Sequence, residues 1–225
     1  MSSKRVLYGV HMSPPVRAPR MTLEALGLDY EFKVVDFQAG ENKTPEYLKK
    51  NPQHTVPLLE DEDGSCVFDS HAIMAYLVRK YGKQNDPLYP KGFYERAVVD
   101  QRLHFENGNL FMGVCRQKLV PLIRGEPKKE EVPEILKSVN EAYELLETFM
   151  GAHKFIAGNE MTIADLSVVT SVAYIDAFVP IQKEKYAKLF AWFKTMKKLP
   201  YYEKVNAEGM QLLKEKIKFN LLDLV

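Results

Sequence analysis

The fold is decided by the stretch from Val6 to Phe37, which reads VLYGVHMSPPVRAPRMTLEALGLDYEFKVVDF. Its first five residues form an apolar run that predicts a strand, and the prolines after Ser13 interrupt that run. Apolar residues at helical spacing predict a helix over 16–26, which ends at Gly27 because glycine tolerates the left-handed conformation common at helix ends. Alternating residues over 31–37 then predict a second strand. The stretch therefore begins a β-α-β unit.

The residues that follow extend this unit. A short helix is predicted after Thr44 and Pro45, since threonine is a good N-cap and proline suits the first helical position. A hairpin is predicted over 57–68, around an acidic turn that contains glycine. An amphipathic helix over 70–81 completes the series. The order β-α-β-α-β-β-α predicts a compact α/β domain over residues 1–82, with a four-stranded mixed sheet.

The sequence changes character after residue 82. Residues 83–91 are polar and contain prolines, which is typical of a linker. Over residues 92–225 the apolar residues recur at helical spacing, which predicts an all-helical domain. Thr162 and Asp165 have the spacing of a capping box. The helix that follows them is almost free of charge, so we expect it to be the buried centre of a bundle.

Composition limits the possible functions. The chain has 225 residues, of which 46% are hydrophobic, enough for two domains of ordinary size. A net charge of +1 without a basic stripe argues against a nucleic-acid partner. No apolar stretch approaches the roughly 18 residues of a membrane helix, and no secretory leader is visible. With only two cysteines, Cys66 and Cys115, we expect free thiols and a cytoplasmic protein.

Ser13 lies between the first predicted strand and the first predicted helix. It can be an N-cap, but the same position lets its hydroxyl donate to an anion beside the positive end of the helix dipole. A bound thiol of pKa about 8.5 is only about 3% thiolate at pH 7. Ionising half of it requires roughly 2 kcal/mol, which one hydrogen bond to the thiolate, about 1.5–3 kcal/mol, can supply. Ser13 is therefore a candidate catalytic residue that needs neither a base nor a metal.

A second motif, Pro52-Gln-His-Thr-Val-Pro57, precedes a predicted strand. Pro57 cannot donate to the sheet, and a cis bond before it would turn the chain sharply. The backbone N–H and C=O of Val56 would then be free to pair with an extended peptide. His54 can either meet a carboxylate or be an ordinary turn histidine.

A third motif, Asp69-Ser-His-Ala-Ile73, opens the helix predicted over 70–81. Asp69 and Ser70 are suitable as an N-cap pair. Alternatively, Ser70 binds a carboxylate at the helix N-terminus while Asp69 pairs with an ammonium, which together are the two charges of an α-amino acid. His71 is the next candidate along the helix.

With these motifs the chain resembles the cytosolic glutathione transferases, most closely the insect enzymes of the epsilon or delta class. The resemblance covers essentially the whole length. It is carried by Asn51–Pro57, Asp69–Ile73, Leu103-His-Phe-Glu106, Thr162-Ile-Ala-Asp165-Leu-Ser and Leu199-Pro-Tyr-Tyr202. It implies a thioredoxin-like N-terminal domain, an all-helical C-terminal domain and glutathione as co-substrate without a metal. It also implies a homodimer, with residues 94–111 of one subunit facing residues 61–80 of the other.

The resemblance also implies residue roles. Ser13 would stabilise the glutathione thiolate, and Val56, before a cis Pro57, would hydrogen-bond the cysteinyl backbone. Asp69 would take part in holding the γ-glutamyl group. The full set expected to contact glutathione is His54 near the glycyl carboxylate, Thr55, Val56, Asp69, Ser70, His71 and Asn42. Asn42 stands where epsilon-type enzymes often have a histidine, and Asp69 where the family frequently has glutamate.

An apolar electrophile is expected between the Ser13 loop and the helical domain, because apolar clefts form where domains meet. The candidate lining residues are Met12, Phe37, Phe111, Val114, Cys115, Leu119, Phe178 and Met210. Cys115 falls near a position where the family often presents an arginine to the electrophile, with Arg116 next to it. Apolar residues at helical spacing can equally belong to the core.

The leading hypothesis is an enzyme that conjugates the glutathione thiolate to apolar electrophiles in xenobiotic detoxification. Elimination of halide and reduction of organic hydroperoxides are related side activities. The alternatives are a non-catalytic carrier of apolar ligands or glutathione conjugates, and a scaffold protein of the same fold. Disulfide exchange by the protein's own cysteines is disfavoured, because the loop that would hold a Cys-x-x-Cys motif is Ser13-Pro-Pro-Val16.

Overall fold

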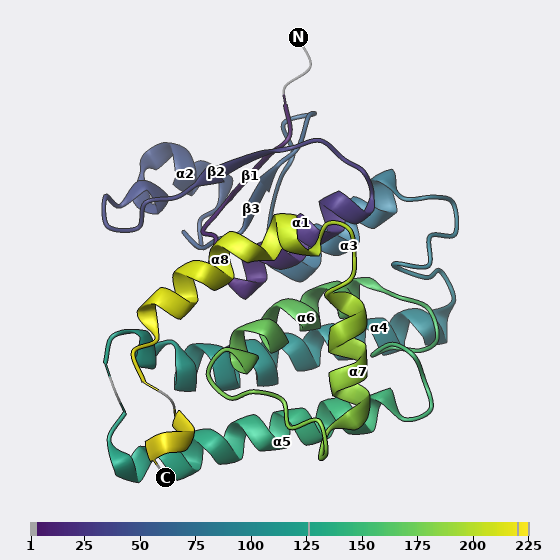
Figure 1. Ribbon diagram of the computed structural model, residues 1–225. Helices are drawn as coiled ribbons and strands as arrows, with labels where there is room; N and C mark the ends of the chain where they lie inside the picture. Colours follow the sequence, from purple (N-terminus) through teal and green to yellow (C-terminus); the bar gives the residue numbers. More distant parts are fainter. Residues whose placement is uncertain (1–3, 126, 220, 225) are drawn as a thin grey trace.

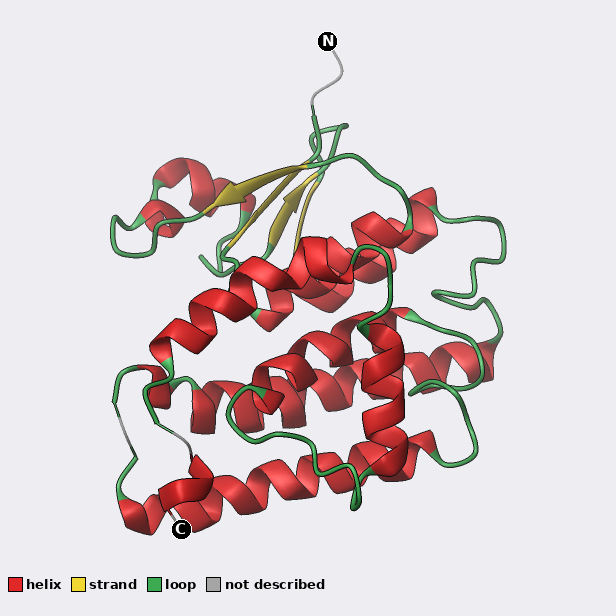
Figure 2. Cartoon of the chain, in the orientation of Figure 1, coloured by secondary structure: helices red, strands yellow, loops and turns green. Residues whose placement is uncertain are grey.

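The computed structural model describes residues 4–125, 127–219 and 221–224. An α/β domain precedes a helical domain, as Figure 1 and Figure 2 show. The four strands of the α/β domain form one mixed sheet in the order β2-β1-β3-β4, in which β1 is parallel to β2 and antiparallel to β3, and β3 is antiparallel to β4. The strands are β1 (Val6–Gly9), β2 (Glu31–Val34), β3 (Leu58–Glu60) and β4 (Cys66–Phe68). The predicted element order and mixed sheet are confirmed.

Two boundaries differ from the prediction for local reasons. The strand expected over 31–37 stops at Val34, because Asp36 turns the chain: its N–H donates to the Glu41 carboxylate (2.8 Å) and its own carboxylate accepts from Gln38 N (2.8 Å). The first helix begins two residues before position 16, since Pro14 and the proline after it suit the first helical turn. The helices of this domain are α1 (Pro14–Ala25), α2 (Pro45–Lys50) and α3 (Ser70–Tyr81).

The C-terminal domain is helical, as expected. Its first helix, α4, continues without a break into a π-helical segment, η2, so the two form one continuous helix. The elements are α4 (Phe93–Phe105), η2 (Glu106–Leu119), α5 (Val132–Met150), α6 (Ile163–Asp176), α7 (Ala187–Met196) and α8 (Tyr202–Lys216), with short 3-10 turns between and after them. Among the described residues, no helix combines the length and the apolarity needed to cross a membrane.

Helix α6 is the centre of the helical domain. Every residue from Ile163 to Ile175 is buried, which confirms the prediction made from its lack of charge. The capping box is also present, with the Thr162 side chain accepting from the backbone of the first turn and Asp165 accepting from Thr162 N. In Figure 1 this helix lies between α8 and α5.

The largest hydrophobic cluster spans both domains. Ala18 and Met21 from α1, and Met74 and Val78 from α3, belong to the same buried cluster as the residues of α6. Helix α8 lies along α1 on the same side of the molecule (Figure 1). The N-terminal end of α1, where Ser13 stands, is therefore fixed against the helical domain.

A buried arginine joins the domains one turn after Ser13. The Arg17 guanidinium donates to Asn206 Oδ1 (2.9 Å) on α8 and to the Thr170 carbonyl (3.0 Å) on α6, and no carboxylate among the described residues pairs with it. Burial lowers the pKa of Arg17 to about 10, so it remains charged at neutral pH. This role of Arg17 was not predicted from the sequence, although Arg17 lies only four residues after Ser13.

A buried carboxylate stabilises the opposite end of the α/β domain. Asp61 accepts hydrogen bonds from Arg5 Nε (2.9 Å), Lys80 Nζ (2.8 Å), Tyr76 Oη (2.6 Å) and Tyr81 Oη (2.6 Å). Burial alone would raise the pKa of Asp61, but the hydrogen bonds from Lys80, Tyr76 and Tyr81 outweigh burial and hold it well below its usual value.

The hydrogen bonds to Asp61 predict how the stability of the protein depends on pH. Because the folded-state pKa of Asp61 lies below the unfolded value of about 3.9, its stabilising contribution is present above about pH 4 and is lost as the pH falls further. The wild-type stability should therefore fall below pH 4 more steeply than that of Asp61→Asn, by up to about 1.4 kcal/mol per pH unit. Urea unfolding between pH 3 and pH 6 measures the difference. Parallel profiles for the two proteins would contradict it.

Candidate active site

Ser13 stands where β1 leads into α1. Its carbonyl accepts from Val16 N (3.1 Å) and Arg17 N (3.0 Å), as an N-cap carbonyl does, but its side chain makes no capping hydrogen bond. The hydroxyl is half-buried and lies at a helix end whose dipole favours an anion. The structure therefore leaves this hydroxyl available to a ligand.

The loop before β3 has the predicted backbone form. The Val56–Pro57 peptide bond is cis, and pairing between β1 and β3 begins at Tyr8 with Leu58. Val56 therefore lies outside the sheet pairing, and within the described residues no hydrogen bond reaches its N–H or its C=O. His54, two residues earlier, is exposed and has a φ of +47°. The loop thus offers free backbone groups next to an exposed imidazole.

Asp69 caps α3. Its Oδ1 accepts from His71 N (3.0 Å) and Ala72 N (3.1 Å), so the N-cap interpretation is confirmed. A φ of +73° is strained for an aspartate, and strain of this kind is concentrated at functional sites. Capping uses one carboxylate oxygen, which leaves the other oxygen of the exposed Asp69 available to a ligand. Ser70, the first residue of the helix, is buried beneath it.

His71 points away from the position expected for a glutathione contact. Its Nε2 lies 2.9 Å from Glu106 Oε2 and 2.9 Å from Ser167 Oγ, both in the helical domain. Glu106 is itself buried and also accepts from the Ser171 hydroxyl. The helical position after Asp69 and Ser70 turns the ring toward η2 and α6, so His71 connects the domains. Glu106 lies within the Leu103-His-Phe-Glu106 segment quoted above, but its buried partners could not be read from the sequence.

Asn42 also has a different role from the one expected. Its side chain is only 3% exposed, and its Nδ2 donates to the His54 carbonyl oxygen (2.7 Å). A side chain held beneath the loop in this way supports His54 rather than presenting itself to a ligand.

The eight residues expected around the electrophile separate into two groups. Half of them are at most 4% exposed and belong to the hydrophobic core, so they leave almost no surface for a ligand: Val114, Cys115, Leu119 and Phe178. Helical spacing identified them as apolar-face residues but could not say that this face points into the bundle. The other half keep accessible surface: Met12, Phe111 and Met210 are half-buried and Phe37 is 47% exposed. Burial also raises the pKa of the Cys115 thiol far above its usual value, which makes it unreactive.

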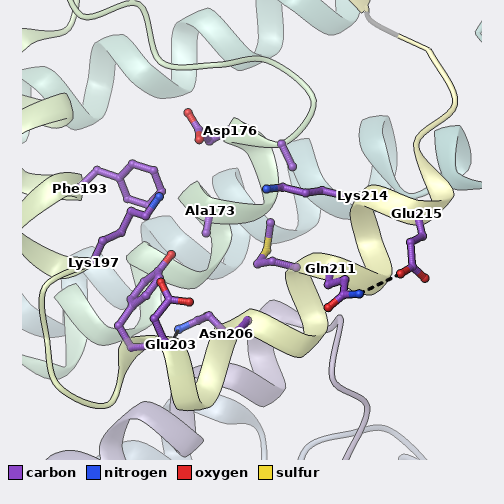
Figure 3. Close-up of a pocket in the computed structure, with 13 residues that line it drawn as sticks. Ala173, Asp176, Phe193, Lys197, Glu203, Asn206, Gln211, Lys214 and Glu215 are labelled. Atoms are coloured by element: carbon purple, nitrogen blue, oxygen red, sulfur yellow. Dashed lines mark hydrogen bonds between the residues drawn. The ribbon is translucent and has the colours of Figure 1, made fainter.

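Met210 lines a cavity of about 720 Å³ between α6, α7 and α8, to which Ser13 does not contribute. Figure 3 shows Lys197 and Lys214 reaching toward this cavity, with Asp176 and Phe193 also at its wall. The wall of this cavity thus carries charged side chains, whereas the pocket predicted from the sequence was lined by apolar residues. Met210 faces this cavity from α8.

Helix α8 packs directly on the Ser13 loop. A Cβ atom added to Gly209 would lie 2.1 Å from the His11 carbonyl oxygen and 3.3 Å from Met12 N. His11 Nδ1 lies 3.1 Å from a carboxylate oxygen of Glu208 beside this contact. The absence of a side chain at Gly209 therefore allows the close approach that fixes the loop.

Gly209→Ala is expected to lower kcat/KM for glutathione conjugation about tenfold, because either α8 or the loop that carries Ser13 must move. The matched control is Gly125→Ala, since Gly125 is an exposed glycine between η2 and α5 whose added Cβ meets nothing within 4 Å. Steady-state kinetics of both variants test the prediction. Equal activities would show that the α8 contact does not position the loop.

The fold and this site together define a class of protein. A thioredoxin-like domain with a cis-proline loop and a free hydroxyl at the start of α1, joined to an all-helical domain, is the arrangement expected above for the glutathione transferases. Comparison with known families agrees. Residues 3–79 match the model of the "Glutathione S-transferase, N-terminal domain" and residues 110–200 that of the "Glutathione S-transferase, C-terminal domain".

Individual relatives show the same relationship. "Glutathione S-transferase 1" of Manduca sexta is 44% identical over 212 residues, which are 93% of this chain and 95% of that protein. An epsilon-class glutathione S-transferase from the housefly, Musca domestica, superposes with a TM-score of 0.87 at 50% identity, covering 96% of this chain and 97% of that one. A homologue from Drosophila mojavensis, solved with bound glutathione, gives 0.84 at 44% identity over 96% of both chains. The chain belongs to the glutathione S-transferase family, and its expected resemblance to the insect enzymes is confirmed.

Proposed function

We propose that this glutathione S-transferase is a serine-type enzyme that conjugates glutathione to apolar electrophiles in xenobiotic detoxification. The observation that carries the proposal is the uncommitted Ser13 hydroxyl at the N-terminus of α1. It would donate to the glutathione sulfur and stabilise the thiolate, which is the nucleophile. The dipole of α1 would act in the same direction.

The peptide part of glutathione would lie along the free backbone groups. The N–H and C=O of Val56 would pair with the cysteinyl residue, and His54 and Thr55 would face the glycyl end. The Asp69 carboxylate would hold the γ-glutamyl ammonium, while Ser70 at the start of α3 would bind the γ-glutamyl carboxylate. The Drosophila mojavensis homologue with bound glutathione supports the tripeptide as the ligand.

In the reaction, the thiol proton leaves to solvent and the thiolate forms a carbon–sulfur bond with the electrophile. For an aromatic halide, the carbon–halogen bond breaks and halide departs with the electron pair. Met12, Phe37 and Phe111, which keep accessible surface, are the proposed wall for the apolar substrate. Halide elimination and hydroperoxide reduction would use the same thiolate, the latter with two glutathione molecules that become one disulfide.

The proposed assembly is a cytoplasmic homodimer. Phe93 is 97% exposed and Tyr94 next to it is also exposed, at the start of the segment 94–111 that we place in the interface. Two adjacent exposed aromatic side chains would contribute to a contiguous apolar patch, and such patches mark interaction surfaces. The interface would pair this segment with residues 61–80 of the partner, and residues 83–91 would link the domains of each subunit.

Within the described residues, no cluster of three or more His, Cys, Asp or Glu side chains could hold a metal ion.

A conjugation assay with glutathione and an aromatic halide tests the proposal. Saturable turnover is expected. Calorimetry with glutathione separates the alternatives, since binding without turnover of any electrophile tested would indicate a carrier of apolar ligands or conjugates. A protein that does not bind glutathione at all would indicate a scaffold.

A further inference from the structure

Three buried side chains beneath the cis-proline loop donate hydrogen bonds to two successive carbonyl groups of the loop. Asn42 Nδ2 donates to the His54 carbonyl oxygen (2.7 Å). Tyr47 Oη donates to the Thr55 carbonyl oxygen (2.7 Å), which also accepts from Asn51 Nδ2 (2.8 Å). These donors come from the 3-10 turn Glu41–Lys43, from α2 and from the C-cap residue that follows α2.

The three donors are committed to the loop. All three side chains are buried, so unmade hydrogen bonds there would leave polar groups without water. Burial raises the pKa of Tyr47 to about 12, and its hydroxyl therefore stays protonated and able to donate at neutral pH. The Asn51 carbonyl oxygen additionally accepts from His54 N (3.0 Å), which closes the turn.

Holding these carbonyl groups fixes where the neighbouring N–H groups point. In a trans peptide the C=O and the following N–H point in opposite directions, and the only cis bond described is Val56–Pro57. With the carbonyls of His54 and Thr55 turned inward, the N–H groups of Thr55 and Val56 must point outward. Neither N–H has a hydrogen-bond acceptor among the described residues.

Two successive outward N–H groups are unusual in extended backbone, where hydrogen-bonding groups alternate in direction. The positive φ of His54, +47°, turns the peptide plane that carries the His54 carbonyl relative to the plane before it. A non-glycine residue keeps this conformation only where its surroundings enforce it. The bond from Asn42 to the His54 carbonyl is one such constraint.

We propose that Asn42 and Tyr47 are positioning residues that orient the N–H groups of Thr55 and Val56 as paired donors to oxygen atoms of the bound tripeptide. The inference rests on the proposed function, because it assumes that glutathione lies along this loop. Asn42, which replaces a histidine frequent in related enzymes, would thus contribute from beneath the loop without touching the ligand.

Tyr47→Phe is the cleanest test, because it removes the donating oxygen and keeps the ring. The matched control is Tyr8→Phe: the Tyr8 ring packs against Tyr47 with centroids 6.0 Å apart, and its hydroxyl donates to Glu60 (2.9 Å) instead of the loop. Tyr47→Phe should raise the glutathione KM and calorimetric Kd about fivefold and leave kcat within about twofold, as expected for one lost hydrogen bond. Tyr8→Phe should leave the glutathione KM and Kd near wild-type values.

Asn42→Ala provides a second variant that acts on the adjacent peptide group, and it should raise the glutathione KM in the same way. Amide NMR adds a readout that a merely structural role would not change: the Thr55 and Val56 signals of the wild type should shift on adding glutathione, and less so in Tyr47→Phe. The inference is overturned if neither Tyr47→Phe nor Asn42→Ala raises KM or Kd more than Tyr8→Phe does. If the wild type itself does not bind glutathione, the proposed function fails as well, so the two failures can be distinguished.

Discussion

Ser13→Ala is expected to lower kcat for glutathione conjugation about 100-fold. The hydroxyl is the only side-chain donor that we assign to the thiolate, and a hydrogen bond to a charged group contributes about 1.5–3 kcal/mol. The pKa of the bound glutathione thiol should rise by about one to two units for the same reason. Steady-state kinetics give the first quantity, and ultraviolet titration of thiolate absorbance in the enzyme–glutathione complex gives the second.

Stability measurements show whether the loss of kcat comes from the missing hydroxyl or from a destabilised fold. Because the Ser13 side chain makes no capping hydrogen bond, Ser13→Ala should change the free energy of unfolding by no more than about 0.5 kcal/mol. The control is Thr162→Ala, whose hydroxyl does accept from Ala164 N (3.2 Å) and whose loss should cost about 1 kcal/mol. Near-normal turnover by Ser13→Ala would rule out the serine-type mechanism.

The largest loss of stability is expected from Asp165→Ala, about 3–5 kcal/mol. The carboxylate is completely buried and accepts from Ile156 N (2.9 Å), Thr162 N (2.9 Å) and Trp192 Nε1 (2.9 Å). It therefore connects the start of α6 to the preceding loop and to α7. Removing it leaves several buried donors without acceptors, each at a cost of about 1–3 kcal/mol.

Urea denaturation measures this loss as a lower midpoint at an unchanged slope. Asp165→Asn is the graded control, because it keeps the shape and one acceptor oxygen of the side chain, so its loss should be smaller. A change of less than about 1 kcal/mol for the alanine variant would show that water replaces the missing acceptor.

Much of the fold could be predicted because its signals are local. Helix α3 has the predicted bounds, since Asp69 caps one end and Gly82 follows the other. The capping box before α6 and the burial of that helix were likewise visible, because N-cap chemistry and the absence of charge are properties of adjacent residues. The bulk of α1 and the order of strands and helices along the chain followed from periodicity and turn residues.

The candidate site was predictable where backbone chemistry defines it. Ser13 at a helix start, Val56 before a cis proline and Asp69 at a strand-to-helix junction are fixed by residues next to them in the sequence. The direction of other side chains was not. His71 lies beside Asp69 and Ser70, yet its ring turns to Glu106, a residue 35 positions away that only tertiary packing brings near.

The sequence by itself determined the element order, the two-domain architecture and the positions of the three motifs, because turns, caps and periodicity act over a few residues. Only the tertiary structure decided which faces became interior. Asn42 lies under the loop and bonds the His54 carbonyl, and Val114 and Cys115 belong to the bundle core. Gly209 packs against the His11 carbonyl. Each of these contacts joins residues that are distant in the chain. The spacing of apolar and polar residues does not show which distant residues will come into contact.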